Sequence, residues 1–260
     1  MIDAILQEFP KYFPEINNAI GAGIFIFARL AGFIRFAPVF NRKEIAGIVK
    51  LSFILILTVV ITMTMKPSAA PTNSSLFLGI LLNFVAGAML GFVAQCITQA
   101  IAAAGDMINM QMGLSSAMVL DPTTSAQVSI VGNFFTVLAM IIFIHVGGVY
   151  WLLSALMRSF EIFPVYAYAI PLEQLVNFDY LIKLTSNVLF VGLQIASPIL
   201  LATLGQDLIL GIISKTAPQV NVFQLSFLFK PVLGAAIMVW IMPIIFNVIS
   251  DYFLSFSKIF

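Results

Sequence analysis

Charged side chains are scarce in this chain. Lysine, arginine, aspartate and glutamate make up 9% of its 260 residues, whereas 61% of the residues are hydrophobic and the mean hydropathy is +1.08. Soluble domains carry about 25% charged residues, so this composition excludes an ordinary soluble domain and predicts an integral membrane protein. The 12 basic and 11 acidic residues nearly cancel, which leaves no electrostatic basis for binding nucleic acid.

Cysteine and histidine are almost absent, with one residue of each, Cys96 and His145. A single cysteine excludes an intrachain disulfide framework and a thiolate metal cluster. Serine proteolysis needs a serine held beside a base, yet His145 is the only histidine and no GxSG motif surrounds any serine. Motifs of the HExxH, CxxC and phosphate-binding glycine-loop types are also missing. The sequence therefore predicts no catalytic residues, no metal and no cofactor.

Long apolar segments are what the chain has in abundance. A helix needs about 20 apolar residues to cross the hydrocarbon of a bilayer. Six stretches are long enough to be considered: 18–40, 47–65, 76–104, 128–157, 181–213 and 229–256. We therefore predict an all-α integral membrane protein of about six long, bent helices or helical hairpins. Pro198, Pro231 and Pro243 predict breaks in the last two, because proline removes a backbone donor and clashes with the preceding turn.

Three charges, Arg29, Arg35 and Asp207, fall inside these apolar stretches. A charge at the centre of a bilayer costs about 3 kcal/mol on insertion scales, so each should face protein or water. One interpretation makes them part of a solute or proton pathway. The other pairs them with carboxylates or carbonyls, in this chain or on a neighbouring subunit, as residues needed for assembly. We favour the second, because Asp207 has no second intramembrane carboxylate or histidine near it in the sequence.

Small residues mark one surface of the third stretch. Gly87 and Gly91 form a GxxxG pattern, and small residues at this spacing let two membrane helices approach closely. The pattern predicts tight helix packing at these two glycines without identifying a function.

Residues 105–122, the Met-rich segment, interrupt the apolar pattern with GDMINMQMGLSSAMVLDP, which contains no lysine or arginine. Irregular backbone at membrane depth survives only where protein or water satisfies its polar groups. We therefore predict a loop that plugs or lines a cavity enclosed by protein, and the adaptable methionine side chain suits a deformable seal. The alternative is a poorly packed loop between two helices.

Several long motifs occur in an order that resembles the FliR family of flagellar export-gate proteins, called SctT in virulence-type secretion systems. They are RLAGFIRFAPVFNRKEI at 29–45, the Met-rich segment, and APQVNVFQLSFLFK at 217–230. The resemblance covers nearly the whole chain. It implies a FliP-like part, residues 1–180, followed by a FliQ-like helical hairpin, residues 181–260.

The resemblance also implies roles for particular residues. The Met-rich segment would plug the closed gate through Met107, Met110, Gln111, Met112, Gly113, Leu114, Ser115, Ser116 and Met118. A cytoplasmic turn near the substrate-entry side would contain Ala217, Pro218, Gln219, Asn221 and Lys230.

The function that the resemblance implies is a non-enzymatic subunit that completes a helical assembly with FliP and FliQ. Its other partners would be FlhB, FlhA, unfolded export substrates and membrane lipid, in the flagellar basal body of the bacterial inner membrane. Two alternatives remain: a subunit of a virulence-type secretion gate, or a stand-alone polytopic transporter. A transporter would pair discontinuous helices around a site at the bilayer midplane, and the breaks in this sequence do not fall into two matching halves.

Overall fold

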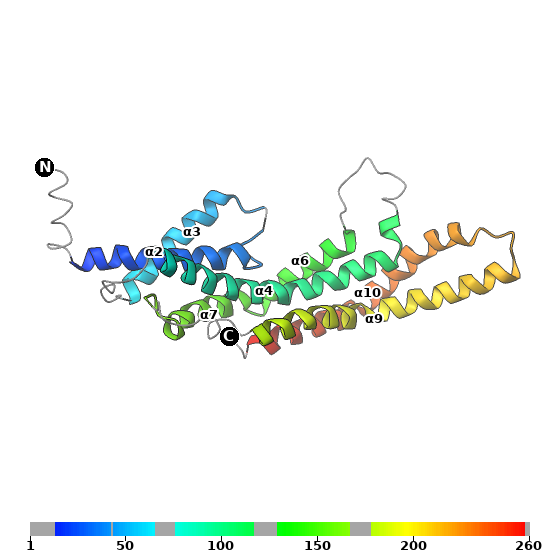
Figure 1. Cartoon of the computed structure of the whole chain (residues 1–260). Helices are drawn as coiled ribbons and strands as arrows, with labels where there is room; N and C mark the ends of the chain where they lie inside the picture. The colour runs from blue at the N-terminus through cyan, green and yellow to red at the C-terminus, as the bar shows by residue number, and fades with distance from the viewer. Residues whose placement is uncertain (1–13, 43, 66–75, 117–128, 167–177, 258–260) are drawn as a thin grey trace. The chain divides into compact units, whose positions relative to one another are not determined.

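The computed structural model describes residues 14–42, 44–65, 76–116, 129–166 and 178–257 (Figure 1). Every regular element in these ranges is a helix, which confirms the predicted all-α class. The elements are α2 (Pro14–Phe36), α3 (Gly47–Met65), α4 (Leu76–Gln111), η1 (Leu114–Ser116), α6 (Ile130–His145), α7 (Gly148–Ile162), α9 (Phe178–Thr216) and α10 (Val222–Ser257).

The number of spans also agrees with the sequence. In the described ranges, α2, α3, α4, α9 and α10 are long and apolar enough to cross a membrane, and α6 with α7 makes a sixth candidate if the pair is one broken span. The break lies at Val146 and Gly147, and Gly147 has a φ of +84°. That conformation ends a helix and is accessible chiefly to glycine. The fourth apolar stretch is thus two helices rather than one.

The prolines do not interrupt the last two helices. Pro198 lies inside α9, and Pro231 and Pro243 lie inside α10, yet each helix is continuous. The predicted breaks are therefore wrong. Proline is tolerated within membrane helices where neighbouring groups compensate the lost backbone donor. α9 has 39 residues and α10 has 36, so each is about 54–58 Å long at 1.5 Å per residue, well beyond the thickness of the hydrocarbon.

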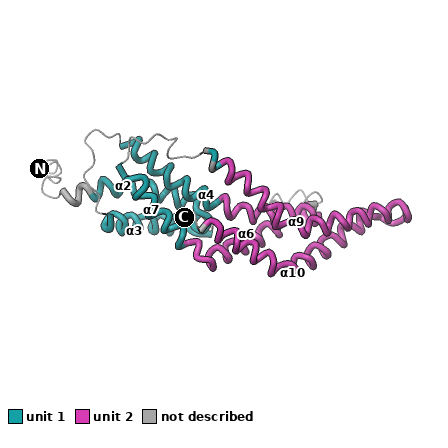
Figure 2. Tube along the Cα trace, turned by 90° about the horizontal axis from the view of Figure 1, so that it is seen from below, with its two compact units in different colours: residues 1–95, 150–181 teal, residues 96–149, 182–260 magenta. Residues whose placement is uncertain are grey.

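The chain divides into two compact units (Figure 2). Unit 1 comprises residues 1–95 and 150–181. In it α3 packs against α2, and the core is built from apolar side chains of α2, α3, α4 and α7. Its most completely buried large side chains include Phe25, Ile26, Leu30, Phe33, Leu152 and Leu156.

Unit 2 comprises residues 96–149 and 182–260. Within it α9 and α10 run side by side as a hairpin, the C-terminal hairpin, and five residues, 217–221, join them (Figures 1 and 2). α6 packs on α10, where the rings of Phe143 and Phe253 meet edge to face with centroids 5.3 Å apart. The division into 1–180 and 181–260 remains a prediction, because the compact units follow spatial contacts and not that boundary.

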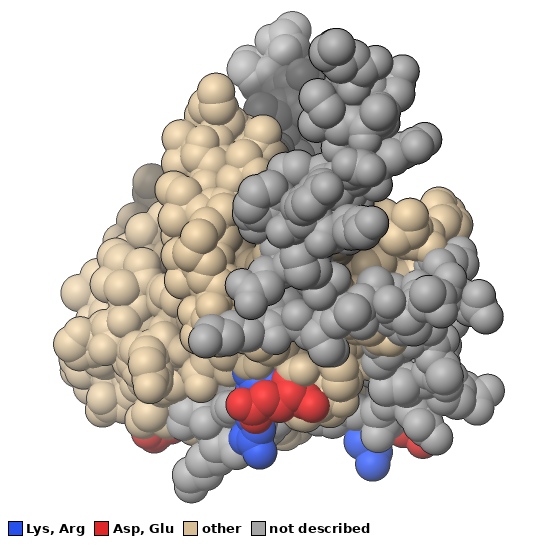
Figure 3. All heavy atoms as spheres, turned by 90° about the vertical axis from the view of Figure 1, so that its left-hand side faces the viewer, with Lys and Arg blue, Asp and Glu red and all other residues tan. Residues whose placement is uncertain are grey.

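Charged side chains are sparse on the face of the molecule that Figure 3 shows. In the view of Figure 3, uncharged side chains cover most of the described surface, and the visible Lys, Arg, Asp and Glu side chains gather near its lower edge. Many large apolar side chains are exposed on the chain alone, among them Trp240 at 82% and Phe223 at 74%. Such a surface is suited to lipid or to protein neighbours rather than to water.

Candidate functional site

The Met-rich segment begins as a helix. Residues 105–111, including Met107, Met110 and Gln111, continue α4, so the prediction of a non-helical loop is wrong for this part. Methionine and glutamine favour helices, and the first strong stop is Gly113, whose φ of +73° is the left-handed conformation that ends a helix. Leu114, Ser115 and Ser116 then form η1, and Met118 lies outside the described residues.

The methionines of this segment have opposite environments. The Met110 side chain is 71% exposed, whereas Met112 is only 3% exposed. Met112 packs against Gly234 of α10, where a Cβ atom would lie 2.7 Å from Met112 Cγ and 2.9 Å from its Sδ. Met112 is therefore a packed residue of unit 2, while Met110 presents its thioether to the surroundings.

Arg29 finds its partners inside unit 1. Its guanidinium is fully buried and donates from Nε and Nη2 to Asn83 Oδ1, at 3.1 and 2.7 Å. Nη1 donates to the Ser159 carbonyl at 2.9 Å, and Nη2 donates to the Phe163 carbonyl at 2.7 Å. The Phe160 ring centroid lies 4.2 Å from Cζ. These contacts place the cation at the C-terminal end of α7, where the helix dipole is negative.

Asn83 is the residue of this cluster that the sequence did not single out. Its Nδ2 donates to the Gly79 carbonyl at 2.9 Å and to the Val165 carbonyl at 3.1 Å, while its Oδ1 receives Arg29. The sequence did contain a signal for it, because Asn83 is a single asparagine inside an otherwise apolar stretch. Burying an amide costs free energy unless the amide is hydrogen-bonded, so such a residue indicates a buried polar contact. Together Arg29 and Asn83 fix the end of α7 and the residues after it to α2 and α4.

Arg35 is unlike Arg29. It lies in the last turn of α2, is exposed, and donates from Nη1 to Asn41 Oδ1 at 3.0 Å. A cation in the last turn of a helix is favoured by the dipole, and a long side chain near a helix end reaches the membrane interface. Its role in assembly stays a prediction.

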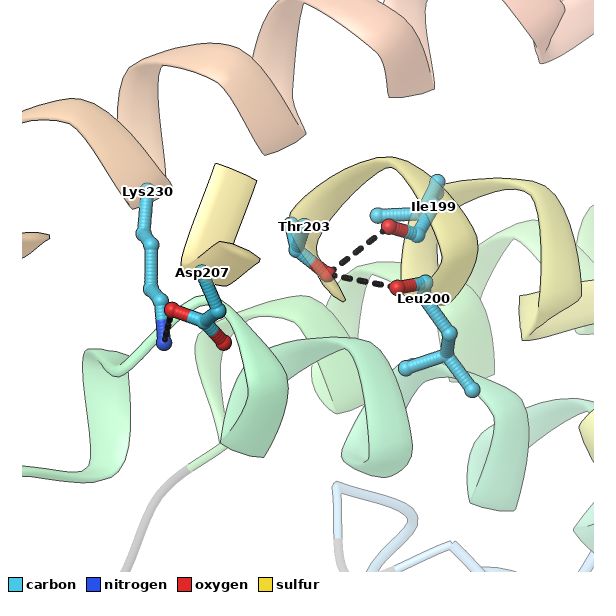
Figure 4. A network of polar contacts seen from close by, with 5 residues as sticks. All are labelled: Ile199, Leu200, Thr203, Asp207 and Lys230. Carbon is cyan, nitrogen blue, oxygen red and sulfur yellow. Dashed lines mark hydrogen bonds and ion pairs between the residues drawn. The ribbon is translucent and has the colours of Figure 1, made fainter. Parts of the chain in front are cut away.

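Asp207 and Lys230 form an ion pair across the C-terminal hairpin (Figure 4), with Nζ 2.7 Å from Oδ1. One turn before Asp207, the buried Thr203 hydroxyl donates to the Ile199 and Leu200 carbonyls of its own helix. Lys230 lies inside α10, so its predicted place in the turn is wrong. The Asp207 carboxylate thus has a cationic partner within the chain, and its role in assembly stays a prediction.

Breaking this pair should loosen the hairpin. We expect Asp207→Asn and Lys230→Met each to lower the thermal stability of the purified protein, with a coupling of about 1 kcal/mol between them, since the partners are partly exposed. The double variant should lose less than the sum of the single variants. Strictly additive losses in this double-mutant cycle would show that the ion pair contributes nothing.

The turn of the hairpin contains the remaining predicted residues. Ala217, Pro218 and Gln219 connect the helices, and Asn221 caps α10 because its Oδ1 accepts from the Gln224 amide at 3.2 Å. The first turns of α10 border a shallow hollow of about 420 Å³. Its lining consists of Val220, Asn221, Gln224, Leu225, Phe227 and Leu228.

Gly87 and Gly91 lie where α4 crosses α2. A Cβ atom at Gly87 would overlap the Arg29 carbonyl oxygen, and one at Gly91 would lie 2.6 Å from the Phe33 carbonyl oxygen. Gly32 on α2 faces Phe84 of α4 in the same manner. The two helices therefore meet backbone to backbone, which is the packing that small residues permit in membrane helices.

Among the described residues no three His, Cys, Asp or Glu side chains are grouped so that they could hold a metal ion. What the described part of the chain does contain is a set of long apolar helices, with buried polar clusters that lock helix to helix. These features define a polytopic, α-helical membrane protein.

The family of this protein follows from a match to the family described as bacterial export proteins, family 1. That family matches residues 20–256, so the chain belongs to it. The resemblance to the FliR family that the motifs predicted is thereby confirmed.

Individual relatives cover most of the chain. It is 29% identical over 241 residues to flagellar biosynthetic protein FliR of Bacillus subtilis strain 168, a match that covers 92% of this chain and 93% of the relative. It is 29% identical to FliR of Escherichia coli K12, over 84% of this chain and 82% of the relative. It is also 25% identical to surface presentation of antigens protein SpaR of Salmonella typhimurium LT2, over 88% and 86%.

Proposed function

We propose that this chain is a structural and gating subunit of a flagellar type III protein-export gate in the bacterial inner membrane. The observation that carries the proposal is the family match over residues 20–256, joined with FliR relatives that are similar over most of their length. In this function the chain acts without catalysis. It completes the assembly of the export gate and closes the export path through it.

The assembly partners in this proposal are FliP and FliQ, with FlhB and FlhA at the cytoplasmic side. Residues 1–180 would act as the FliP-like part and residues 181–260 as the FliQ-like part. Support comes from the C-terminal hairpin, since 17% of the α10 span and 33% of the α9 span are buried within the chain. Two long helices with so little of their surface covered have large faces left for neighbouring subunits or lipid.

The Met-rich segment would supply the plug of the closed gate. Its described part leaves α4 through a left-handed glycine and a single 3-10 turn, and it exposes a methionine, Met110. A plug must block ions and still yield to an unfolded polypeptide. Methionine and small residues suit this requirement because they repack around varied surfaces and fix few contacts.

The assembly proposal is tested by co-expressing the chain with its FliP-like and FliQ-like neighbours, purifying through a tag on this chain, and weighing the complex by native mass spectrometry. We expect a stable complex that contains one copy of this chain. Recovery of the chain alone, folded and free of partners, would contradict the proposal and favour a stand-alone transporter.

The plug proposal is tested by deleting residues 113–118. The deletion starts after Met112 because Ile108 and Met112 are buried, at 0% and 3% exposed, and removing them would damage unit 2. We expect the assembled gate to leak small ions, seen as raised membrane conductance, with little loss of complex. A variant in which a Gly/Ser linker of equal length replaces 113–118 controls for loop closure. Unchanged membrane conductance in both variants would contradict the plug proposal.

A virulence-type secretion gate is the second candidate, and the similarity to SpaR favours it. The two candidates differ in the substrates that they export, so they are separated by deleting the gene and observing which structure is lost. Loss of flagella with normal secretion of other substrates supports the flagellar function.

A further inference from the structure

Asn109, in the last turn of α4, forms hydrogen bonds with one residue of η1 and one residue in the first turn of α6. Its Nδ2 donates to Ser115 Oγ at 3.0 Å, and its Oδ1 accepts from the Val131 backbone amide at 3.4 Å. Ser115 belongs to η1, which begins three residues after the last residue of α4, and Val131 is the second residue of α6. All three residues belong to unit 2. One side chain thus bridges the exit from α4 and the entrance to α6.

The chemistry of the amide explains why asparagine fits this position. A backbone N–H can only donate, so Oδ1 must face Val131 and Nδ2 is left to donate to the hydroxyl. Asn109 is 4% exposed and the Val131 side chain is 5% exposed. Losing either bond therefore leaves a buried polar group without a partner. Asparagine is also a poor residue inside a helix, so a tertiary role accounts for its presence here better than helix propensity does.

The helices meet closely at the same place. One turn before Asn109, a Cβ atom on Gly105 would lie 2.8 Å from Gly132 Cα and from the Val131 carbonyl oxygen. The Asp106 carboxylate lies against Gly132, at the N-terminal turn of α6, where the helix dipole favours negative charge. Ser129 caps α6, since its Oγ accepts from the Gly132 amide at 2.8 Å. The entrance to α6 is thus held by α4, by the cap and by backbone contact.

The exit from α4 has a second, apolar attachment. Met112, three residues beyond Asn109, packs against Gly234 of α10 and is 3% exposed. Residues 109–115 are therefore fastened by a hydrogen bond at Ser115 and by a buried thioether at Met112. Met110, which lies between Asn109 and Met112, faces outward and is 71% exposed.

We propose that Asn109 is a positioning residue that clamps the exit from α4 to the entrance to α6. By holding Ser115 and the first turn of α6 to one point on α4, it fixes the exit from α4 relative to the entrance to α6. This inference rests on the proposed plug function, yet the clamp has a readout of its own.

That readout is amide hydrogen exchange, measured by mass spectrometry on the co-purified gate complex that contains the full chain. We expect Asn109→Ala to speed exchange about fivefold or more in both residues 112–116 and residues 130–136, because both bonds are lost. Ser115→Ala removes one bond only, so it should speed exchange in 112–116 and leave 130–136 unchanged. Ser255→Ala is the matched control in the same unit, since the exposed Ser255 hydroxyl donates to the Tyr252 carbonyl of its own helix.

The outcomes separate the clamp from the plug. Unchanged exchange in both segments of Asn109→Ala would overturn the clamp, as would equal effects of Ser115→Ala and Ser255→Ala on residues 112–116. If Asn109→Ala does not assemble, the Ser115 and Ser255 variants decide the question in the same way. Membrane conductance is read in parallel. A leak in Asn109→Ala at normal complex yield supports the positioning role. If the 113–118 deletion does not leak, the plug proposal is contradicted, and the clamp is then decided by the hydrogen-exchange result alone.

Discussion

Gly87→Ala should prevent the chain from accumulating as a folded protein, although it adds a single methyl group. The added Cβ would overlap the Arg29 carbonyl oxygen and lie 2.7 Å from the carbonyl carbon and 3.0 Å from the Phe33 amide nitrogen. All three atoms belong to the α2 backbone, which cannot rotate away as a side chain can. The helices must separate, and every contact along the crossing is then weakened.

The cost is set by how much of the crossing depends on contact between backbones. Overpacking a well-filled core costs about 1–3 kcal/mol, and here the neighbouring glycines, Gly32 and Gly91, lose their close approach at the same time. We therefore expect a loss at or above the upper end of that range. Protein stabilities are about 5–15 kcal/mol, so such a loss sharply reduces the amount of chain recovered from membranes.

A glycine-to-alanine substitution elsewhere in the chain should not lower its stability. Gly211 lies inside α9, and a Cβ atom there has no neighbour within 4 Å among the described residues. Alanine is favoured over glycine in a helix interior by about 1 kcal/mol, so Gly211→Ala should be neutral or slightly stabilising. The measurement is the yield and thermal midpoint of each variant in the same detergent. Equal behaviour of the two variants would show that the α2–α4 crossing does not depend on glycine.

The second large effect is expected for Arg29→Met. Methionine fills much of the space but donates no hydrogen bond, so Asn83 Oδ1 and the Phe163 carbonyl lose their donor from Arg29. Each buried acceptor left without a donor costs about 1–3 kcal/mol. The Ser159 carbonyl is less affected, because it also accepts from the Phe163 amide at 2.9 Å. We expect the end of α7 to detach and the thermal midpoint to fall.

Arg29→Lys should not rescue the fold. An ammonium group has three donors on a flexible stem, whereas the guanidinium donates in a planar fork, and Arg29 uses that fork to reach Asn83, Ser159 and Phe163 together. Lysine would keep a buried charge and lose part of its compensation. Its stability should therefore be no higher than that of Arg29→Met.

A partner variant separates orphaned acceptors from lost packing. Adding Asn83→Leu to Arg29→Met removes the orphaned amide oxygen, and replacing a buried polar pair by apolar residues is often close to neutral. Because Asn83→Leu also removes the donor to the Val165 carbonyl, the expected result is that the double variant loses less stability than the sum of the two single variants. The matched control is Arg35→Met on the same helix, where an exposed arginine with its bond to Asn41 should matter little. If the Arg35 and Arg29 variants lose equal stability, the buried cluster is not what holds α7.

Class and span number were predictable from the sequence because they depend on composition summed over long stretches. Six apolar runs with few charges can only be satisfied by helices in a membrane, and the described helices agree. The position of the glycine crossing could also be predicted, since Gly87 and Gly91 repeat at the spacing of one helix face. These features are local in sequence, so no knowledge of distant residues was needed.

Features that depend on distant residues were missed or placed wrongly. The helix through Met107, Met110 and Gln111 was predicted as loop, because its polar residues suggest irregular backbone and their packing partners lie elsewhere in the chain. Lys230 was assigned to a turn, yet α10 starts eight residues earlier, at Val222, and carries the lysine to Asp207. The helices α9 and α10 are continuous at their prolines because of neighbouring groups in the folded chain, and helix propensity takes no account of such groups.

The amino-acid sequence by itself determined that the chain is an all-helical membrane protein, where its helices can pack closely, and to which family its motifs are similar. Only the tertiary structure decided which groups satisfy the buried polar side chains: Arg29 with Asn83, Asp207 with Lys230, and Asn109 with Ser115 and Val131. The reason is physical. Hydropathy and helix spacing are properties of neighbouring residues, whereas a buried hydrogen bond requires two groups to meet within about 3 Å, and which groups meet is set by the packing of whole helices.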